Sequence, residues 1–423
     1  MASSTQKEKQ ILVGIVIFSL ALHLLFLLTP IPAKDTTHID EDVYTSLAHS
    51  LVEQTALILP WEPHSLDIVG QPSMEWTPGY PLLMALGILL GFTNLVLWAG
   101  IVQAFFIALL AIPIWFLARL VLPKRWALPT ALMTSFYPTF FVLFPRIMPE
   151  PSCTLLVTSG LGLILCSTSR IRQTLGGVLL GLAVLFRPEF LSYALVLVAW
   201  LTIRKQFRSV GLILLALGLV LSPWIIRNME LSGHLVLSTR APRVIFEQNE
   251  GYLLAARQGL NREEVFARYP LSSADYTRSQ QLKTVIVQWI HNHPKDYAEL
   301  CVKRMASMVT PFFVKDYLMR RAGLRNITAE KLSPHFRYAE LSFQILFWLL
   351  ALPGIAILLW KSRKSLRSLF LAPQGLLLLF CLLQVGVSFF LVYASYQRST
   401  LDMVWLLAGL SGWAMLKKAR GTN

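Results

Sequence analysis

The residues best suited to chemistry form an acidic group, Asp40, Glu41 and Asp42, in the stretch HIDEDVYTSLAHSL of residues 38–51. A carboxylate such as Asp40 or Glu41, placed at a membrane surface, could act as a general base that deprotonates an acceptor hydroxyl. The same acids could instead start a helix, with Asp40 as its N-cap and the next two in the first turn, where the helix dipole favours negative charge. Capping and catalysis are compatible, so both interpretations stay open.

A second group consists of arginines that end apolar blocks. They are Arg146 in FPRIMPEP, Arg187 in GLAVLFRPEF and Arg398 in YASYQRST. Since a guanidinium fork matches the geometry of a phosphate, these side chains could bind a lipid-borne phosphate. The structural alternative is pairing with Glu150, Glu189 or Asp402, or extension toward the membrane surface. We expect at least one of the three to contact phosphate.

The stretch EWTPGYPLLMALG, residues 75–87, is a third candidate. Glu75 could supply another carboxylate to the site, with Tyr80 as a substrate-binding neighbour. The simpler interpretation is a proline turn whose aromatic side chains anchor at the membrane interface. The apolar run 81–92 is too short to cross a bilayer and predicts a juxtamembrane helix, as does the apolar face that begins at Tyr44.

The elements that must position these residues are membrane helices. Of the 423 residues, 55% are hydrophobic and only 14% are charged, which excludes a water-soluble domain. We predict an all-α polytopic membrane protein, a single domain over residues 1–423, with about ten transmembrane helices. The two short blocks on either side of Arg187, 174–187 and 189–203, could instead form one long broken helix. The blocks are 11–30, 94–122, 127–144, 151–166, 174–187, 189–203, 209–226, 338–360, 369–394 and 399–416.

The distribution of charge predicts the orientation. The net charge is +15, and alternate short loops are basic, which is typical of cytoplasmic loops and not of a nucleic-acid surface. The loop 227–337 also holds 17 Lys and Arg, but loops longer than about 60 residues contribute little to orientation. Both termini are then cytoplasmic. Two large loops, 31–93 and 227–337, face the other side and hold interfacial helices. We expect an integral, multi-pass protein of a bacterial inner membrane with an outward-facing site.

Several motifs are absent or have a structural explanation. The sequence has no P-loop, no HExxH and no GxSxG, and its four cysteines are scattered without metal-ligand spacing. Gly177 and Gly181 form a GxxxG that favours close helix packing. No cofactor is required by these residues, although the clustered acids could bind a divalent cation such as Mg²⁺ or Mn²⁺.

Taken together, the order of these segments resembles the GT-C class of membrane glycosyltransferases. The similarity rests on the acidic loop after the first span, PGYPLLMALG, PRIMPEP, GGVLLGLAVLFRPEFL and PWIIRNMELSGHLVLST, with YQRSTLDMVWLLAGL as a looser match. It covers residues 1 to about 240. It is strongest to the branch that holds the protein O-mannosyltransferases (glycosyltransferase family 39) and the bacterial aminoarabinose and lipopolysaccharide-core sugar transferases.

The resemblance implies inverting transfer of a sugar from a polyprenyl-phosphate donor to a hydroxyl of a lipid, glycan or protein on the non-cytoplasmic face. It implies that Asp40 is the key acid, with Glu41 as companion, and that Arg187 is the basic residue after the glycine-rich span. The additional acid Asp42 leaves open which of the three carboxylates acts as the base. A membrane glycan polymerase or ligase is the main alternative, and a polytopic transporter a more distant one.

Overall fold

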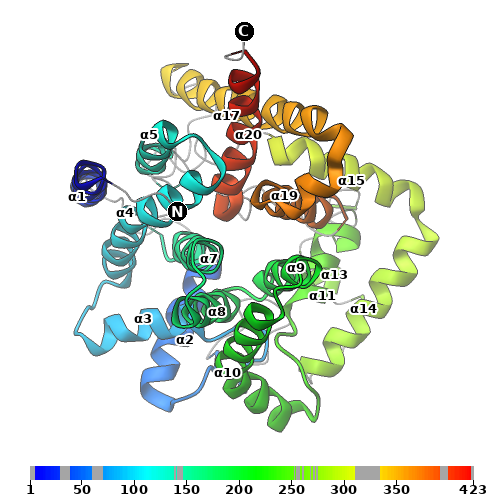
Figure 1. The fold of residues 1–423 in the computed structure, drawn as a ribbon. Coiled ribbons are helices and arrows are strands. Elements are labelled where there is room, and N and C mark those ends of the chain that lie inside the picture. Colours follow the sequence, from blue (N-terminus) through cyan, green and yellow to red (C-terminus); the bar gives the residue numbers. More distant parts are fainter. Residues whose placement is uncertain are drawn as a thin grey trace.

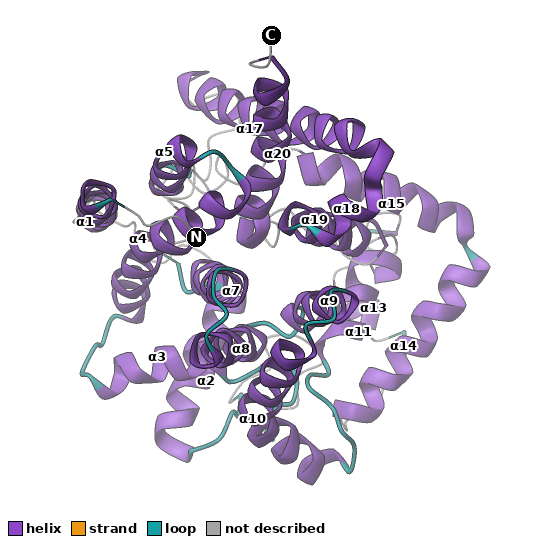
Figure 2. Cartoon of the chain, in the orientation of Figure 1, coloured by secondary structure: helices purple, strands orange, loops and turns teal. Residues whose placement is uncertain are grey.

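In the computed structural model, the described residues form helices joined by turns and loops, and their one β-bridge, between Ile58 and Pro72, is isolated (Figures 1 and 2). The described residues are 5–28, 39–59, 70–137, 140, 146–251, 253, 258–259, 262–266, 268–269, 272, 275–309, 334–390 and 399–420.

Each of the ten apolar blocks contains a helix. Four of the described helical stretches are long and apolar enough to cross a membrane. They are α1 (Gln6–Leu28), α4 (Leu95–Val121), α10 (Phe207–Ser232) and Ile345–Leu371, which begins within α17 (Pro334–Ser362). These helices mark an integral membrane protein, while the full count of ten crossings stays a prediction. The remaining blocks form shorter helices, which are α5 (Lys124–Ser135), α7 (Glu150–Leu165), α8 (Arg170–Phe186), α9 (Phe190–Ile203), α19 (Pro373–Phe390) and α20 (Ser399–Arg420).

The bundle is held together by apolar helix-to-helix packing. α4 packs against α1, α5 and α7, α8 packs against α7 and α10, and α17 packs against α20. The prediction for the GxxxG motif is confirmed, because a Cβ on Gly177 would lie 2.8 Å from that of Ala216, and one on Gly181 would lie 2.9 Å from that of Val220, both on α10.

The stretch around Arg187 is a helix hairpin and not one long broken helix. Residues from the start of α8 and from the end of α9 line the same cavity, so the two helices run in opposite directions. Pro188 and Glu189 form the turn, and Arg187 closes α8 with an extended backbone. Arg187 therefore lies at the tip of the hairpin, at the opposite end from that cavity.

Two short helices cover this end of the bundle. They are α2 (Ile39–Gln54) and α3 (Gly79–Leu89), which pack against each other, and Val43, Tyr44, Leu47 and Ala48 of α2 are buried. One prediction was wrong: α2 begins at Ile39, so Asp40 lies inside its first turn and is not the N-cap. Gly79 is needed where α3 meets α8, because a Cβ there would clash with the Phe186 ring and lie 2.7 Å from the Leu185 carbonyl oxygen.

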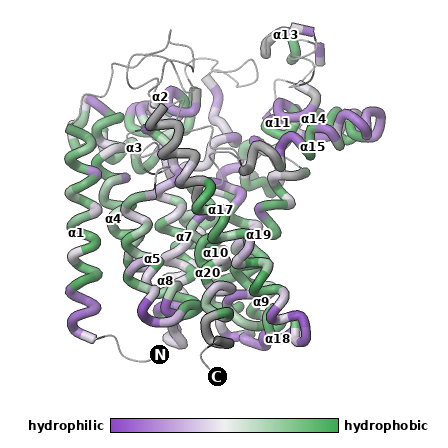
Figure 3. The backbone as a smooth tube through the Cα atoms, turned by 90° about the horizontal axis from the view of Figure 1, so that it is seen from above, coloured by the Kyte–Doolittle hydropathy of each residue, from purple (hydrophilic) through white to green (hydrophobic). Residues whose placement is uncertain are grey.

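The loop 227–337 contributes further helices on the same end. Those described are α11 (Arg240–Phe246), the π-helical turn η1 (Glu247–Gly251), α13 (Arg262–Phe266), α14 (Asp275–Asn292) and α15 (Pro294–Val309). Figure 3 shows α2, α3 and α11 at the end opposite both chain termini, with the green hydrophobic helices between. η3 (Arg363–Ser365) and α18 (Leu366–Leu371) connect α17 to α19 at the other end.

Candidate active site

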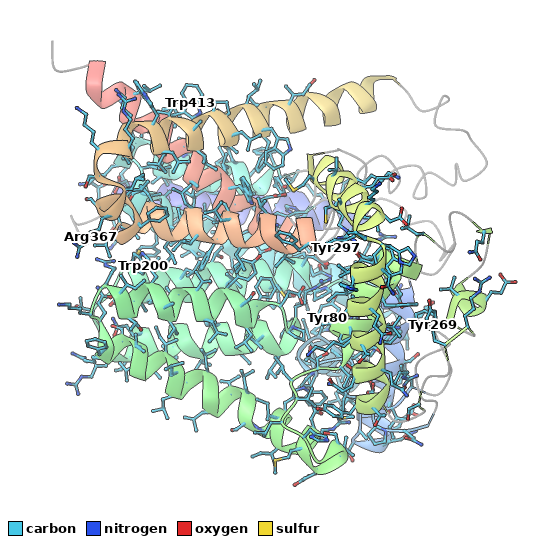
Figure 4. All side chains as sticks on the ribbon, turned by 90° about the vertical axis from the view of Figure 1, so that its right-hand side faces the viewer. Tyr80, Trp200, Tyr269, Tyr297, Arg367 and Trp413 are labelled. Carbon is cyan, nitrogen blue, oxygen red and sulfur yellow. The ribbon has the colours of Figure 1, made fainter. Side chains whose placement is uncertain are left out.

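The candidate active site is a cluster of acid–arginine pairs that gathers segments from distant parts of the sequence. It joins the first turn of α2, the turn before α3, the segment before α7, the tip of the α8–α9 hairpin, and α11. Tyr80, which belongs to this cluster, lies in Figure 4 at the end opposite Trp200 and Arg367. The charged groups of the cluster lie at or near helix ends, because a charged side chain in the middle of an apolar membrane helix is costly.

Asp40 is paired with Arg240 of α11. The Arg240 Nη2 atom lies 3.3 Å from Asp40 Oδ1 and 3.5 Å from Oδ2, and its guanidinium sits 3.6 Å from the ring centre of Trp76. The Asp40 side chain is 20% exposed, so the carboxylate remains accessible to a reactant. Stacking on Trp76 fixes the plane of the guanidinium and thereby orients the arginine toward the acid.

Glu41, the next residue, is paired with Arg146. Its Oε1 atom lies 3.3 Å from Arg146 Nε. The backbone carbonyl of Arg146 accepts a 2.6 Å hydrogen bond from Gln103 Nε2, which also donates to the Tyr80 hydroxyl at 3.1 Å. The ring of Tyr80 packs edge-on against Tyr44. A buried amide on α4 therefore fixes Arg146 and Tyr80 relative to one another.

Glu75 is buried and forms an ion pair with Arg243, also of α11. The backbone around Glu75 is held by the second large loop, since Ser238 Oγ donates to the Glu75 carbonyl at 2.7 Å and the Thr239 N–H donates to that of Met74 at 3.2 Å. Glu75 is therefore more than part of a proline turn, because it joins the two loops through charge and backbone contacts.

Arg187 bridges two carboxylates. It pairs with Glu150 at the start of α7 and, at 3.0 Å, with Glu189 in the hairpin turn. The local pair forms because the turn at Pro188 interrupts the helix and lets residues two apart approach. Glu150 is fully buried, which makes its charge dependent on Arg187.

The surroundings of Asp40 favour its ionised form. Burial opposes ionisation, but the charges of Arg240, Arg187 and Arg243 outweigh it and hold the pKa of Asp40 below its usual value. Burial raises the pKa of the nearby Tyr44 and Tyr80 hydroxyls, which therefore stay protonated at neutral pH. The cluster thus offers one accessible carboxylate, ready to accept a proton, among several fixed cations.

Within the described part of the chain, no three His, Cys, Asp or Glu side chains are grouped so that they could hold a metal ion. Instead, Asp40, Glu41 and Glu75 each face an arginine. A divalent cation at these acids would have to displace those arginines.

The cluster contains six of the residues that the sequence singled out. They are Asp40, Glu41, Glu75, Tyr80, Arg146 and Arg187. Arg398 lies outside the described residues. Arg240, Arg243, Trp76 and Gln103 were not anticipated. The segment RAPRV, which holds both α11 arginines, directly follows PWIIRNMELSGHLVLST, so its position was available as a signal, but its pairing with Asp40 was not.

No protein-family model matches the sequence, and no curated protein matches it. Solved structures do match. The archaeal oligosaccharyltransferase AglB from Archaeoglobus fulgidus, in complex with an inhibitory peptide and a dolichol-phosphate, is 14% identical, with a TM-score of 0.54 over 99% of this chain and 53% of AglB. The apo form gives a TM-score of 0.55 at the same identity and coverage.

A third match is ArnT from Cupriavidus metallidurans bound to undecaprenyl phosphate, 14% identical over 96% of this chain and 79% of ArnT. Its TM-score of 0.41 is too low to support a conclusion. The AglB matches show that this chain has the fold of the GT-C membrane glycosyltransferases, as the sequence resemblance predicted. The chain spans about half the length of AglB.

Proposed function

We propose that this protein is an inverting glycosyltransferase that uses a polyprenyl-phosphate sugar as donor and a hydroxyl as acceptor on the non-cytoplasmic face of the membrane. The observation that carries the proposal is the accessible Asp40 carboxylate, kept ionised by arginines at one end of an apolar helix bundle. The AglB complex contains dolichol-phosphate, which is consistent with a lipid-linked phosphate as the donor's leaving group.

In the proposed reaction, Asp40 accepts the proton of the acceptor hydroxyl as its oxygen attacks the anomeric carbon of the sugar. The bond from that carbon to the phosphate oxygen breaks, and polyprenyl phosphate leaves with the electron pair. Because attack and departure occur on opposite faces in one displacement, the anomeric configuration inverts.

The arginines would stabilise the charge that develops on the phosphate. Arg187 and Arg146 are the proposed phosphate ligands among the described residues, and Arg398 remains a candidate from the sequence alone. Glu41, Glu75 and Tyr80 would hold these groups in place. We propose that these guanidinium groups, and not a divalent cation, stabilise the leaving phosphate, so addition of EDTA should leave transfer unchanged.

A membrane glycan polymerase or ligase is the second candidate, favoured by one observation. Arg240 and Arg243 come from the loop 227–337, where that class would place its essential residues. A transporter fits less well, because its ionisable residues would gather near the middle of the bilayer and these pairs lie at one end.

The donor distinguishes these classes. Purified full-length protein should release polyprenyl phosphate when it is supplied with the right member of a panel of polyprenyl-phosphate monosaccharides, and Asp40→Asn protein should not. A ligase would instead consume a polyprenyl-diphosphate glycan. Turnover of that substrate alone, or of neither, would contradict the proposal. Comparing the glycolipids and glycoproteins of deleted and parent cells by mass spectrometry would then identify the acceptor.

A further inference from the structure

A cavity at the opposite end of the bundle has no part in the proposed reaction. Its volume is about 600 Å³, and it is lined by the ends of α4, α7 and α9 and the starts of α8 and α10. Three lining residues are cations, Arg204, Lys205 and Arg208, and none of the residues that line it is acidic. Among the described residues, no carboxylate forms an ion pair with these three side chains.

We propose that this cavity binds the phosphate headgroup of an anionic phospholipid. Ser209 supplies a hydrogen-bonding group to this cavity: it lines the cavity, the residue is 8% exposed, and its hydroxyl is open to the cavity. A hydroxyl that is open to a cavity beside three cations can donate a hydrogen bond to a phosphate oxygen that those cations attract.

The backbone around the cavity is also suited to an anion. The starts of α8 and α10 both contribute to it, and neither the N-cap Ser169 nor the N-cap Gln206 makes a side-chain capping bond. Helix N-termini carry a partial positive charge and free N–H groups, which add to the field of the side chains.

Lys205 adopts an unusual conformation for its residue type. Its φ is +59°, at the turn where α9 ends, and its N–H donates to the Thr202 carbonyl at 2.8 Å while that of Gln206 donates to Leu201 at 2.9 Å. This is a helix-ending motif whose left-handed position normally takes glycine. A lysine at this position therefore carries a conformational cost that glycine would not.

The lipid is favoured over a soluble phosphate by the apolar side chains around the cavity. Phe207 lines it and is 64% exposed, and Ile203, which directly precedes the lining residue Arg204, is 69% exposed. In a bilayer these side chains would contact acyl chains while the cations bind the headgroup. The bias of basic residues to this side of a membrane explains the charges, but it explains neither the cavity nor Ser209.

Native mass spectrometry of the full-length protein, titrated with dioleoyl phosphatidylglycerol or dioleoyl phosphatidylcholine, tests the proposal. We expect the first phosphatidylglycerol to bind about tenfold tighter than phosphatidylcholine, since each basic residue near a headgroup adds several-fold in affinity. The triple variant Arg204→Gln/Lys205→Gln/Arg208→Gln should lose this preference. The matched variant Lys361→Gln/Arg363→Gln/Lys364→Gln, which removes three charges from another basic loop, should keep it.

Two further variants keep the proposal falsifiable if the triple variant fails to fold. Lys205→Gly suits the left-handed backbone, so it should weaken phosphatidylglycerol binding without lowering the melting temperature. Ser209→Ala should weaken it by a smaller factor. Equal binding of both lipids, or equal losses in both triple variants, would overturn the proposal. Competition by millimolar inorganic phosphate would also overturn it, because the occupant would then be a soluble anion.

Discussion

Both ends of the helix bundle carry clustered arginines, but the groups that surround these arginines differ. At the end that holds α2, α3 and α11, Arg146, Arg187, Arg240 and Arg243 each face a carboxylate. At the other end, the three cations beside the cavity face none. The number of arginines alone therefore does not identify an active site. Where arginines are partly buried and paired with carboxylates, acid–base chemistry is possible. Where cations have no paired carboxylate, we expect them to bind an external anion.

The largest expected effect comes from Asp40→Asn. Asparagine keeps nearly the same shape and can still hydrogen-bond Arg240, but it cannot accept a proton, so transfer should fall by at least about 100-fold. Release of polyprenyl phosphate measures the loss, and unchanged thermal unfolding shows that the fold is intact. Glu41→Gln, made in parallel, should cost less. Full activity of Asp40→Asn protein would remove Asp40 from the chemistry.

Loss of Arg187 should affect both stability and donor binding. Arg187→Ala leaves Glu150 buried without its partner, which should cost about 3–5 kcal/mol of stability. Adding Glu150→Gln should recover part of that stability in thermal unfolding.

The double variant then separates the two roles of Arg187. If Arg187 also binds the donor phosphate, the KM for the donor should stay raised by about tenfold in folded Arg187→Ala/Glu150→Gln protein, because a charged hydrogen bond to the phosphate is lost. Arg187→Lys should restore binding only partly, since a point charge replaces a two-pronged donor. A normal donor KM in the double variant would leave Arg187 with a purely structural role.

Loss of Arg240 should change the pH dependence of transfer. Arg240→Gln removes the strongest of the charges that lower the pKa of Asp40 and leaves burial, which raises it. A base is lost as pH falls through its pKa, so the acidic limb of the kcat/KM profile should move to higher pH. The deficit relative to the parent protein should shrink as pH rises, because Asp40 is then ionised in both. An unshifted limb would mean that another group is the base.

The smallest effect on transfer is expected from substitutions far from the candidate active site. Lys361→Gln/Arg363→Gln/Lys364→Gln removes three exposed charges near η3 and should leave transfer within about twofold of the parent protein, since solvent screens exposed charges over this separation. A large loss would show that the two ends of the bundle are coupled and that the contrast between them is incomplete.

Much of the helical architecture could be predicted from the sequence. The apolar blocks became helices, the periodic face at Tyr44 and Leu47 became buried, and the apolar run from Pro81 became the short helix α3. These features depend on neighbours a few residues apart, which the sequence displays directly. The expected position of Asp40 was wrong by two positions, since it is the second residue of α2 and not its N-cap; capping depends on the backbone before the helix and not only on residue type.

The sequence by itself determined that the chain forms membrane helices and that its acids and arginines lie at helix ends. Only the tertiary structure decided which of them pair. Asp40 and Arg240 are 200 residues apart, and Glu75 and Arg243 meet because the second large loop folds back onto the first. No local pattern specifies such partners, since charge attraction is nearly indifferent to which carboxylate an arginine meets. The packing of α8 against α7 and of α2 against α3 brings particular helix ends together, and that proximity selects the pairs.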